Sequence, residues 1–251
     1  MELLKSYLPN FLFILLRAGI VLNLLPVFGS KTFPAQFRIG LAVAFSLVLT
    51  PVVQFPVENA AVPVIIIREV MFGMIFGLGA RMIFFTVDMA GQIMSNATGL
   101  SIATVFNPEI GQSTEIARLY GIVAILLFLA LDMHHDLITV FVKSYEWLPA
   151  GSPMDPGRLS AAAVSFTGSV FTVSLKLAAP VMIIMLISHV MLGFISRVVP
   201  QINILFVGFP IYLVVGFLVM ILGLPVFITV LGGYFSSIKD ELMRLIVVLK
   251  G

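Results

Sequence analysis

Asp132, His134, His135 and Asp136 belong to a segment, DMHHD, whose side chains are of the types that ligate metal ions. A strong metal signature would place two histidines four residues apart, on one face of a helix. Here the histidines are adjacent, and adjacent side chains on a helix point about 100° apart. We therefore interpret the segment as solvated polar residues that end an apolar block, and we predict neither a metal ion nor an organic cofactor.

Ionisable residues within apolar blocks form a second group that could do chemistry, because each is costly there unless it is paired or hydrated. Arg81 and Asp88 are two helical turns apart and share a face, and Glu115 precedes Arg118 by one turn. We predict that these four residues form buried ion pairs with a structural role. Other charges or titratable groups within the blocks are Arg17, Arg68, Glu69, Lys176 and His189.

The sequence carries no complete catalytic motif. Gly99, Leu100 and Ser101 resemble the serine motif of intramembrane rhomboid proteases, but Ile102 stands where that motif has glycine. A phosphate-binding loop, a zinc-protease helix and a nucleophile elbow are all missing from the sequence. The chain also has no cysteine, which excludes disulfides and cysteine nucleophiles. We predict a protein that is not an enzyme.

The composition is that of a membrane protein. Hydrophobic residues make up 60% of the 251 residues and charged residues only 10%, whereas soluble domains are roughly a quarter charged. The mean hydropathy is +1.15. The formal net charge of +2 is scattered along the chain and forms no basic stripe, which argues against nucleic-acid binding. Membrane lipid is therefore an expected partner.

Six apolar blocks alternate with short, turn-rich connections, and they indicate a single all-α domain spanning residues 1–251. The blocks are residues 11–28, 39–53, 64–87, 116–131, 171–195 and 204–231. Spanning a bilayer takes about 20 apolar residues, so the second and fourth blocks are short. Pro180, Pro210 and Pro225 lie within blocks and predict kinked helices, while Gly73 and Gly77 predict close helix packing. Residues 236–250 are predicted to form an amphipathic helix at an interface.

Residues 91–118, GQIMSNATGLSIATVFNPEIGQSTEIAR, are too polar to face lipid and too rich in small and apolar residues for a solvated loop. Irregular backbone is tolerated at membrane depth only where protein or a water-filled cavity satisfies its polar groups. We therefore predict an irregular, plug-like passage that closes a conduit. Met89 flanks this passage and Met94 lies in it, and flexible thioether side chains make them candidate gasket residues.

Two segments of the chain resemble the FliR family, integral components of the bacterial flagellar type III export apparatus. The first is GQIMSNATGLSIATVFNPEIGQSTEIARLYGIVAILLFLALDMHHDLI, residues 91–138, and the second is KLAAPVMIIMLISHVMLGFISRVVPQINILFVGFP, residues 176–210. The combination of G-L-S-x-A-x-x-x-N-P with S-R-x-x-P-Q-x-N is specific. Length and block order agree with the family from end to end. The first segment is more similar to the flagellar proteins than to their injectisome counterparts.

This resemblance implies a FliP-like part followed by a FliQ-like hairpin, and one copy per pore complex with FliP and FliQ subunits. It implies FlhB and FlhA as neighbours, unfolded flagellar proteins as export substrates, and a place in the inner membrane at the flagellar basal body, extending to the periplasmic side. The family's plug loop corresponds to residues 105–113, which gives the plug role to Phe106, Asn107, Pro108, Glu109, Ile110 and Gly111. Phe106 and Ile110 would fill the lumen.

A stand-alone membrane transporter or channel for small solutes is the alternative interpretation. Such transporters place their site between paired helix interruptions in two halves of the chain. The sequence shows one central irregular passage rather than a matched pair. A purely structural scaffold is a third class, and it predicts that changes in the passage cause no leak.

Overall fold

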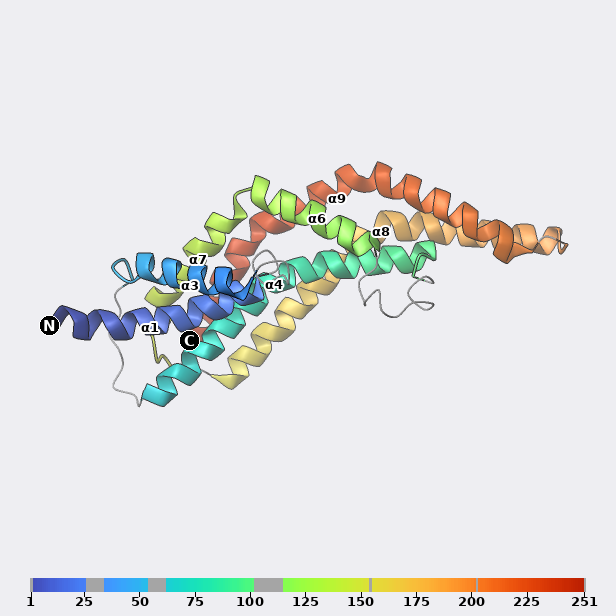
Figure 1. Ribbon diagram of the computed structural model, residues 1–251. Helices are drawn as coiled ribbons and strands as arrows, with labels where there is room; N and C mark the ends of the chain where they lie inside the picture. Colours follow the sequence, from blue (N-terminus) through green and yellow to red (C-terminus); the bar gives the residue numbers. More distant parts are fainter. Residues whose placement is uncertain are drawn as a thin grey trace. The chain divides into compact units, whose positions relative to one another are not determined.

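The computed structural model describes residues 2–25, 34–53, 62–101, 115–153, 155–201 and 203–250. These residues form seven helices and no strand, which confirms the predicted all-α class (Figure 1). The helices are α1 (Glu2–Leu24), α3 (Ala35–Leu49), α4 (Val62–Thr98), α6 (Glu115–Ala130), α7 (Met133–Trp147), α8 (Pro156–Val198) and α9 (Ile204–Lys250).

Each of the six apolar blocks lies largely or wholly within one helix, and α7 is the helix that the blocks do not predict. Its polar residues interrupt the apolar pattern, but its buried side chains recur at helical spacing, as Met133, Val140, Phe141 and Tyr145 show. The helix begins after Asp132, which adopts a left-handed conformation with φ 54°. This residue separates α7 from α6.

Four helices are long and apolar enough to cross a membrane, namely α1, α4, α8 and α9, and the broken pair α6 and α7 makes a fifth if it is one span. α8 has 43 residues and α9 has 47, so at 1.5 Å per residue they are about 65 and 70 Å long. The hydrocarbon core of a bilayer is only about 30 Å thick. Both helices are therefore much longer than one crossing requires.

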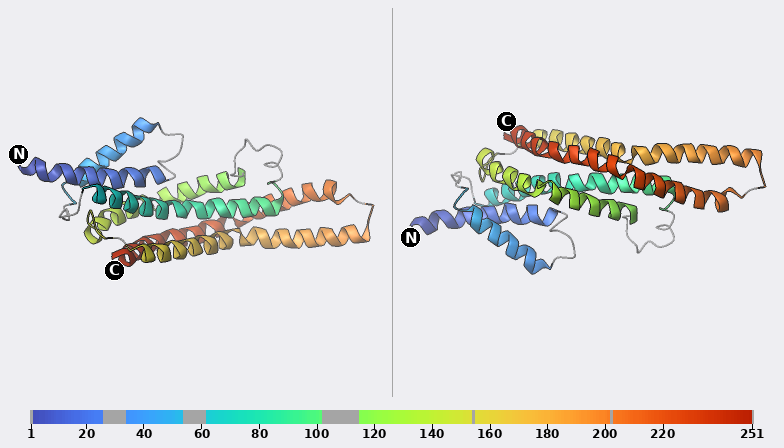
Figure 2. Two further views of the ribbon diagram at one scale, coloured as in Figure 1. Left: turned by 90° about the horizontal axis from the view of Figure 1, so that it is seen from below. Right: turned by 90° about the horizontal axis from the view of Figure 1, so that it is seen from above.

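The chain divides into two compact units, and α4, α8 and α9 contribute residues to both. Unit 1 comprises Met1–Ile83, Asp132–Gly168 and Ser236–Gly251, and unit 2 comprises Phe84–Leu131 and Ser169–Phe235. Within unit 2, the later part of α8 and the earlier part of α9 run side by side as an antiparallel hairpin (Figure 2). α8 contains Pro180 and α9 contains Pro210 and Pro225, yet each remains one continuous helix.

Unit 1 has a core made by α1, α3, α4 and α7, including Ile14, Leu49, Ile65 and Phe141. Glycines bring α4 close to α1, as the sequence predicts. A Cβ at Gly77 would lie 2.6 Å from the Cδ1 atom of Leu24, and one at Gly73 would lie 3.0 Å from the Cβ atom of Ile20. Larger residues at these two positions would force the helices apart.

Unit 2 has an aromatic core. The rings of Phe84 and Phe128 lie 5.4 Å apart, and that of Phe128 lies 6.0 Å from that of Phe235. The rings of Tyr120 and Phe227 pack edge to face at 4.5 Å. These pairs join α4, α6 and α9, and their separations are typical of favourable aromatic contacts.

The structure corrects two predicted boundaries. Residues 91–98 belong to α4 and residues 115–118 to α6, so these ends of the predicted irregular passage are helical. Residues 236–250 are the last part of α9 and not a separate helix, and several of their apolar side chains pack inside unit 1. Ile238, Leu242 and Ile246 are each at most 2% exposed.

Candidate functional site

The first stem of the central passage is the C-terminal end of α4. Gly99 follows Thr98 with φ 79°, the left-handed conformation that commonly ends a helix and that glycine adopts without steric cost. Before this point the Thr98 hydroxyl donates a hydrogen bond to the Met94 carbonyl at 3.1 Å. Thr98 is thus accommodated within the helix, because its hydroxyl bonds to the helix's own backbone.

The second stem, the start of α6, packs directly on the first. A Cβ at Gly91 of α4 would lie 2.4 Å from the Cα atom of Ala117 of α6, so only glycine fits there. A Cβ at Gly216 of α9 would lie 2.5 Å from the Cγ2 atom of Thr98. Close approach at these glycines packs the last part of α4 against the start of α6 and against α9. The predicted plug residues Phe106, Asn107, Pro108, Glu109, Ile110 and Gly111 lie outside the described residues.

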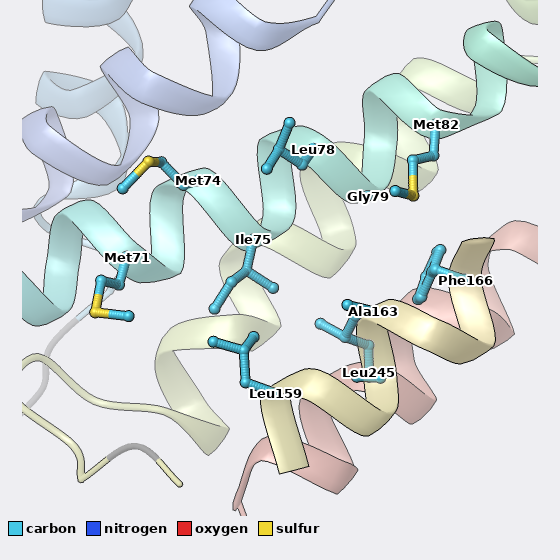
Figure 3. A pocket seen from close by; sticks show the side chains of 11 residues that line it. Met71, Met74, Ile75, Leu78, Gly79, Met82, Leu159, Ala163, Phe166 and Leu245 are labelled. Carbon is cyan, nitrogen blue, oxygen red and sulfur yellow. The ribbon is translucent and has the colours of Figure 1, made fainter. Parts of the chain in front are cut away.

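The methionines predicted as gasket residues lie on α4 within unit 2. Met94 is 1% exposed and therefore fills the interior of the unit. Met89 is half-buried. Three other methionines of α4 line an apolar cavity of about 270 Å³ in unit 1, together with side chains of α8 and α9 (Figure 3). They are Met71, Met74 and Met82.

Of the four residues predicted to form ion pairs, the structure brings one pair together. The Nη1 atom of Arg118 lies 3.3 Å from the Oε1 atom of Glu115, and both side chains are more than half exposed in the chain by itself. Arg81 is exposed and Asp88 is half-buried. Seven residues separate them by about 10 Å along α4, and no ion pair joins them in the described part of the chain.

A buried ion pair that the sequence does not predict lies in unit 1, between Arg17 of α1 and Glu69 of α4. The Nε and Nη2 atoms of Arg17 donate to the two Glu69 carboxylate oxygens at 2.8 and 2.7 Å. Both side chains are 0% exposed. Two parallel bonds of this kind are the strongest geometry for such a pair. The guanidinium also donates to the Ser144 hydroxyl and to the Leu148 carbonyl.

Aromatic side chains complete the surroundings of this guanidinium. The Arg17 Cζ atom lies 3.9 Å from the centre of the Tyr145 ring and 5.0 Å from that of Phe72. Three helices, α1, α4 and α7, and the residue that follows α7 therefore all contribute to the surroundings of the Arg17 guanidinium. Opposite charges in two apolar blocks were the signal in the sequence, but 52 residues separate them and no local spacing identifies the partner.

Two hydroxyl groups make polar contacts between helices in unit 2. The Ser174 hydroxyl of α8 donates to the Thr86 carbonyl of α4 at 2.9 Å. The Tyr120 hydroxyl of α6 donates to the Met220 carbonyl of α9 at 3.3 Å. The ring of His189 stacks on that of Tyr212 at 4.1 Å, and its Nδ1 atom lies 2.7 Å from the Met185 carbonyl of its own helix.

Long apolar helices, close glycine contacts and a buried ion pair define the class of this protein, which is an all-α integral membrane protein. The profile of a known family, described as bacterial export proteins, family 1, matches residues 8–238. Two similar proteins are both named flagellar biosynthetic protein FliR. The one from Caulobacter vibrioides is 30% identical over 83% of this chain and 85% of its own length.

The second, from Pectobacterium carotovorum, is 30% identical over 94% of this chain and 92% of its own length. A protein of the same name from Escherichia coli is 28% identical over 96% of this chain and 94% of its own length. The chain therefore belongs to the FliR family of bacterial export proteins, as the two sequence segments predict. It is a membrane-embedded member of that family, with helices that are apolar enough to span a bilayer.

Proposed function

We propose that the chain is a non-enzymatic subunit of the flagellar type III export conduit, through which unfolded flagellar proteins leave the cell, and that residues 106–111 plug the closed conduit. Membership of the export family and the names of its relatives support the flagellar role. The observation that carries the plug assignment is the fixing of both stems at Gly91 and Gly216, because an occluding segment needs anchored ends.

Assembly with other apolar subunits is the second part of the proposal. α8 and α9 expose large side chains along their length, for example Phe194 at 64%, Phe206 at 81% and Leu222 at 77%. Each helix is about twice as long as the hydrocarbon core is thick, so lipid tails alone do not cover this surface. Extended apolar surface of this kind marks protein interfaces. We assign its coverage to FliP and FliQ subunits, with FlhB and FlhA as neighbours, in the bacterial inner membrane.

Ion conductance of the purified complex tests the plug. Deleting residues 105–113 should leave co-purification with FliP and FliQ intact while the closed complex, reconstituted in planar bilayers, conducts ions. A second variant replaces the same nine positions with alternating glycine and serine. It controls for chain length, because it keeps the length but removes Phe106 and Ile110. If these two side chains occlude the lumen, the closed complex with this second variant conducts ions as well.

An intact complex that remains closed after the deletion would contradict the plug assignment. The oligomeric state tests the conduit separately. The proposal requires assembly with several other apolar subunits, whereas a stable chain that transports small solutes alone would favour the transporter. Failure to co-purify would thus reject the conduit, while a tight variant complex would reject only the plug.

A further inference from the structure

Asp132, His134 and His135 form a cluster at the start of α7, within unit 1. Each offers one ligand atom, and these three atoms all lie within 4.8 Å of one another. The His135 Nδ1 atom lies 3.8 Å from the Asp132 Oδ1 atom, and the centres of the two imidazole rings are 4.1 Å apart. Asp132 adopts a left-handed conformation at the 70° bend between α6 and α7, immediately before the helix.

We propose that this cluster binds a divalent transition-metal ion of the Zn²⁺ class through one carboxylate oxygen and two imidazole nitrogens. Zinc bonds to nitrogen and oxygen are about 2.0–2.2 Å long, so tetrahedral ligand atoms are about 3.3 Å apart. The 3.8 Å gap between Asp132 and His135 needs to close by about 0.5 Å. Side chains that are 71% and 73% exposed can make that movement by small changes in their torsion angles. The other gaps in the cluster are at most 4.8 Å and need to close by at most about 1.5 Å.

A second observation concerns His134. Its Nδ1 atom is buried and has no hydrogen-bond partner among the described residues. Buried polar atoms are nearly always satisfied by protein, water or an ion. A metal ligated through this Nδ1 atom would remove the cost of that unsatisfied nitrogen. The spacing of the adjacent histidines in the sequence gives no such indication, because it is the turn at Asp132 that completes the set.

The neighbouring charges leave these three groups available. Asp136, the last residue of the DMHHD segment, forms an ion pair with Lys239 of α9. The Lys239 Nζ atom lies 2.6 Å from the Asp136 Oδ1 atom. It is therefore not counted as a ligand. Three protein ligands leave a fourth tetrahedral position for water or for a group from another subunit. The ion would hold the first turn of α7 to the residue that precedes it.

Cobalt binding by the full chain, carrying an affinity tag without histidine, tests this inference. We expect one bound Co²⁺ per chain. Its visible absorption spectrum should be that of Co²⁺ with tetrahedral nitrogen and oxygen ligands, and Zn²⁺ should displace it. His134→Ala, His135→Ala and Asp132→Asn should each weaken binding by about 100-fold or more, because even groups that only support a ligand contribute 10–100-fold. Zn²⁺ should also raise the thermal midpoint of the unmodified chain.

The third histidine of the chain provides the matched control. His189 lies in unit 2, and His189→Ala should leave the cobalt spectrum and affinity unchanged. Absence of stoichiometric Co²⁺ binding to the unmodified chain would overturn the proposal without any variant. Equal binding by the His134→Ala, His135→Ala and Asp132→Asn chains, or an equal loss in His189→Ala, would overturn it too. The cluster would then be only an exposed pair of Asp132 and His135.

Discussion

Both units bury hydroxyl groups, but among the described residues only unit 1 also buries an ion pair. Unit 1 buries a complete ion pair, Arg17 and Glu69, with both side chains 0% exposed. The buried polar side chains described in unit 2 are all hydroxyls, namely Thr86, Ser95, Thr98 and Ser174. A charge in an apolar interior needs its one partner, whereas a hydroxyl can bond to a carbonyl of its own helix. Register is therefore more strictly specified in unit 1.

Thr98 and Ser174 illustrate the tolerance of unit 2. Among the described residues, the Thr98 hydroxyl bonds only within α4, to the carbonyls of Met94 and Ser95. The Ser174 hydroxyl bonds both to Val170 of its own helix and to Thr86 of α4. Loss of the contact between helices would leave Ser174 with its local bond. We infer that the helices around the central passage can shift at a lower cost than those around Arg17.

Removing one member of the buried ion pair should break the more strictly specified unit and have the largest effect. Glu69→Leu leaves the Arg17 guanidinium without its carboxylate, and such an uncompensated buried charge costs about 3–5 kcal/mol. The double variant Arg17→Met, Glu69→Leu should recover most of that loss. The measurement is the thermal midpoint in detergent, followed by the fluorescence of Trp147, the only tryptophan of the chain.

Two results would count against this account of unit 1. One is a double variant as unstable as the single variant, since the ion pair would then not be the source of the loss. The other is a Glu69→Leu chain with an unchanged midpoint. Either would also remove the contrast between the units.

Closing the helix contact in unit 2 should have the next largest effect. Gly91→Ala places a Cβ 2.4 Å from the Ala117 Cα atom, so α4 or α6 must move. Overpacking of this kind typically costs about 1–3 kcal/mol. In Gly223→Ala, the control within α9, the added Cβ has no heavy atom within 4 Å, and alanine should be neutral or slightly stabilising. The thermal midpoints of both chains provide the measurement.

Equal midpoints for these two variants would show that unit 2 absorbs the added methyl group without cost. The steric fixing of the passage stems would then be wrong. A loss in both variants would indicate that the helices tolerate no change at glycine, irrespective of contact.

Ser174→Ala tests the hydroxyl contact and should have a smaller effect. It removes the donor to the Thr86 carbonyl, and a typical hydrogen bond contributes about 0.5–1.5 kcal/mol. Ser188→Ala is the matched control, because its exposed hydroxyl bonds only to Ile184 of the same helix. We expect a small fall in the thermal midpoint for the first variant and none for the second. A fall as large as that of Glu69→Leu would contradict the proposed tolerance of unit 2.

The described helices other than α7 were predictable because apolar blocks and turn residues are local signals, whereas the partners of the charges were not. Arg17 and Glu69 stand out as ionisable residues in apolar blocks. Their pairing depends on how α1 packs on α4, which no spacing within one helix reveals. The predicted pair of Arg81 and Asp88 rests on a shared face, but seven residues along a helix is too far for contact.

The limits of the central passage were predicted too widely, for a physical reason. Small and hydroxyl residues were interpreted as irregular backbone, but the Thr98 hydroxyl bonds to its own helix and Gly91 allows close packing against Ala117. Polarity alone therefore does not distinguish a loop from a helix that packs on other helices. Gly99, with its positive φ, marks the actual end of α4.

An exposed ion pair in unit 1 separates the role of burial from that of charge, and its loss should have the smallest effect. The Arg158 Nε atom lies 3.4 Å from the Asp155 Oδ2 atom, with the two side chains 46% and 56% exposed. Arg158→Gln should change the stability by less than about 0.5 kcal/mol, because water and salt screen such a pair. The thermal midpoint, compared at low and high salt, provides the measurement, and any difference should vanish at high salt. A loss that rivals that of Glu69→Leu and persists in salt would mean that charge, rather than burial, makes unit 1 sensitive.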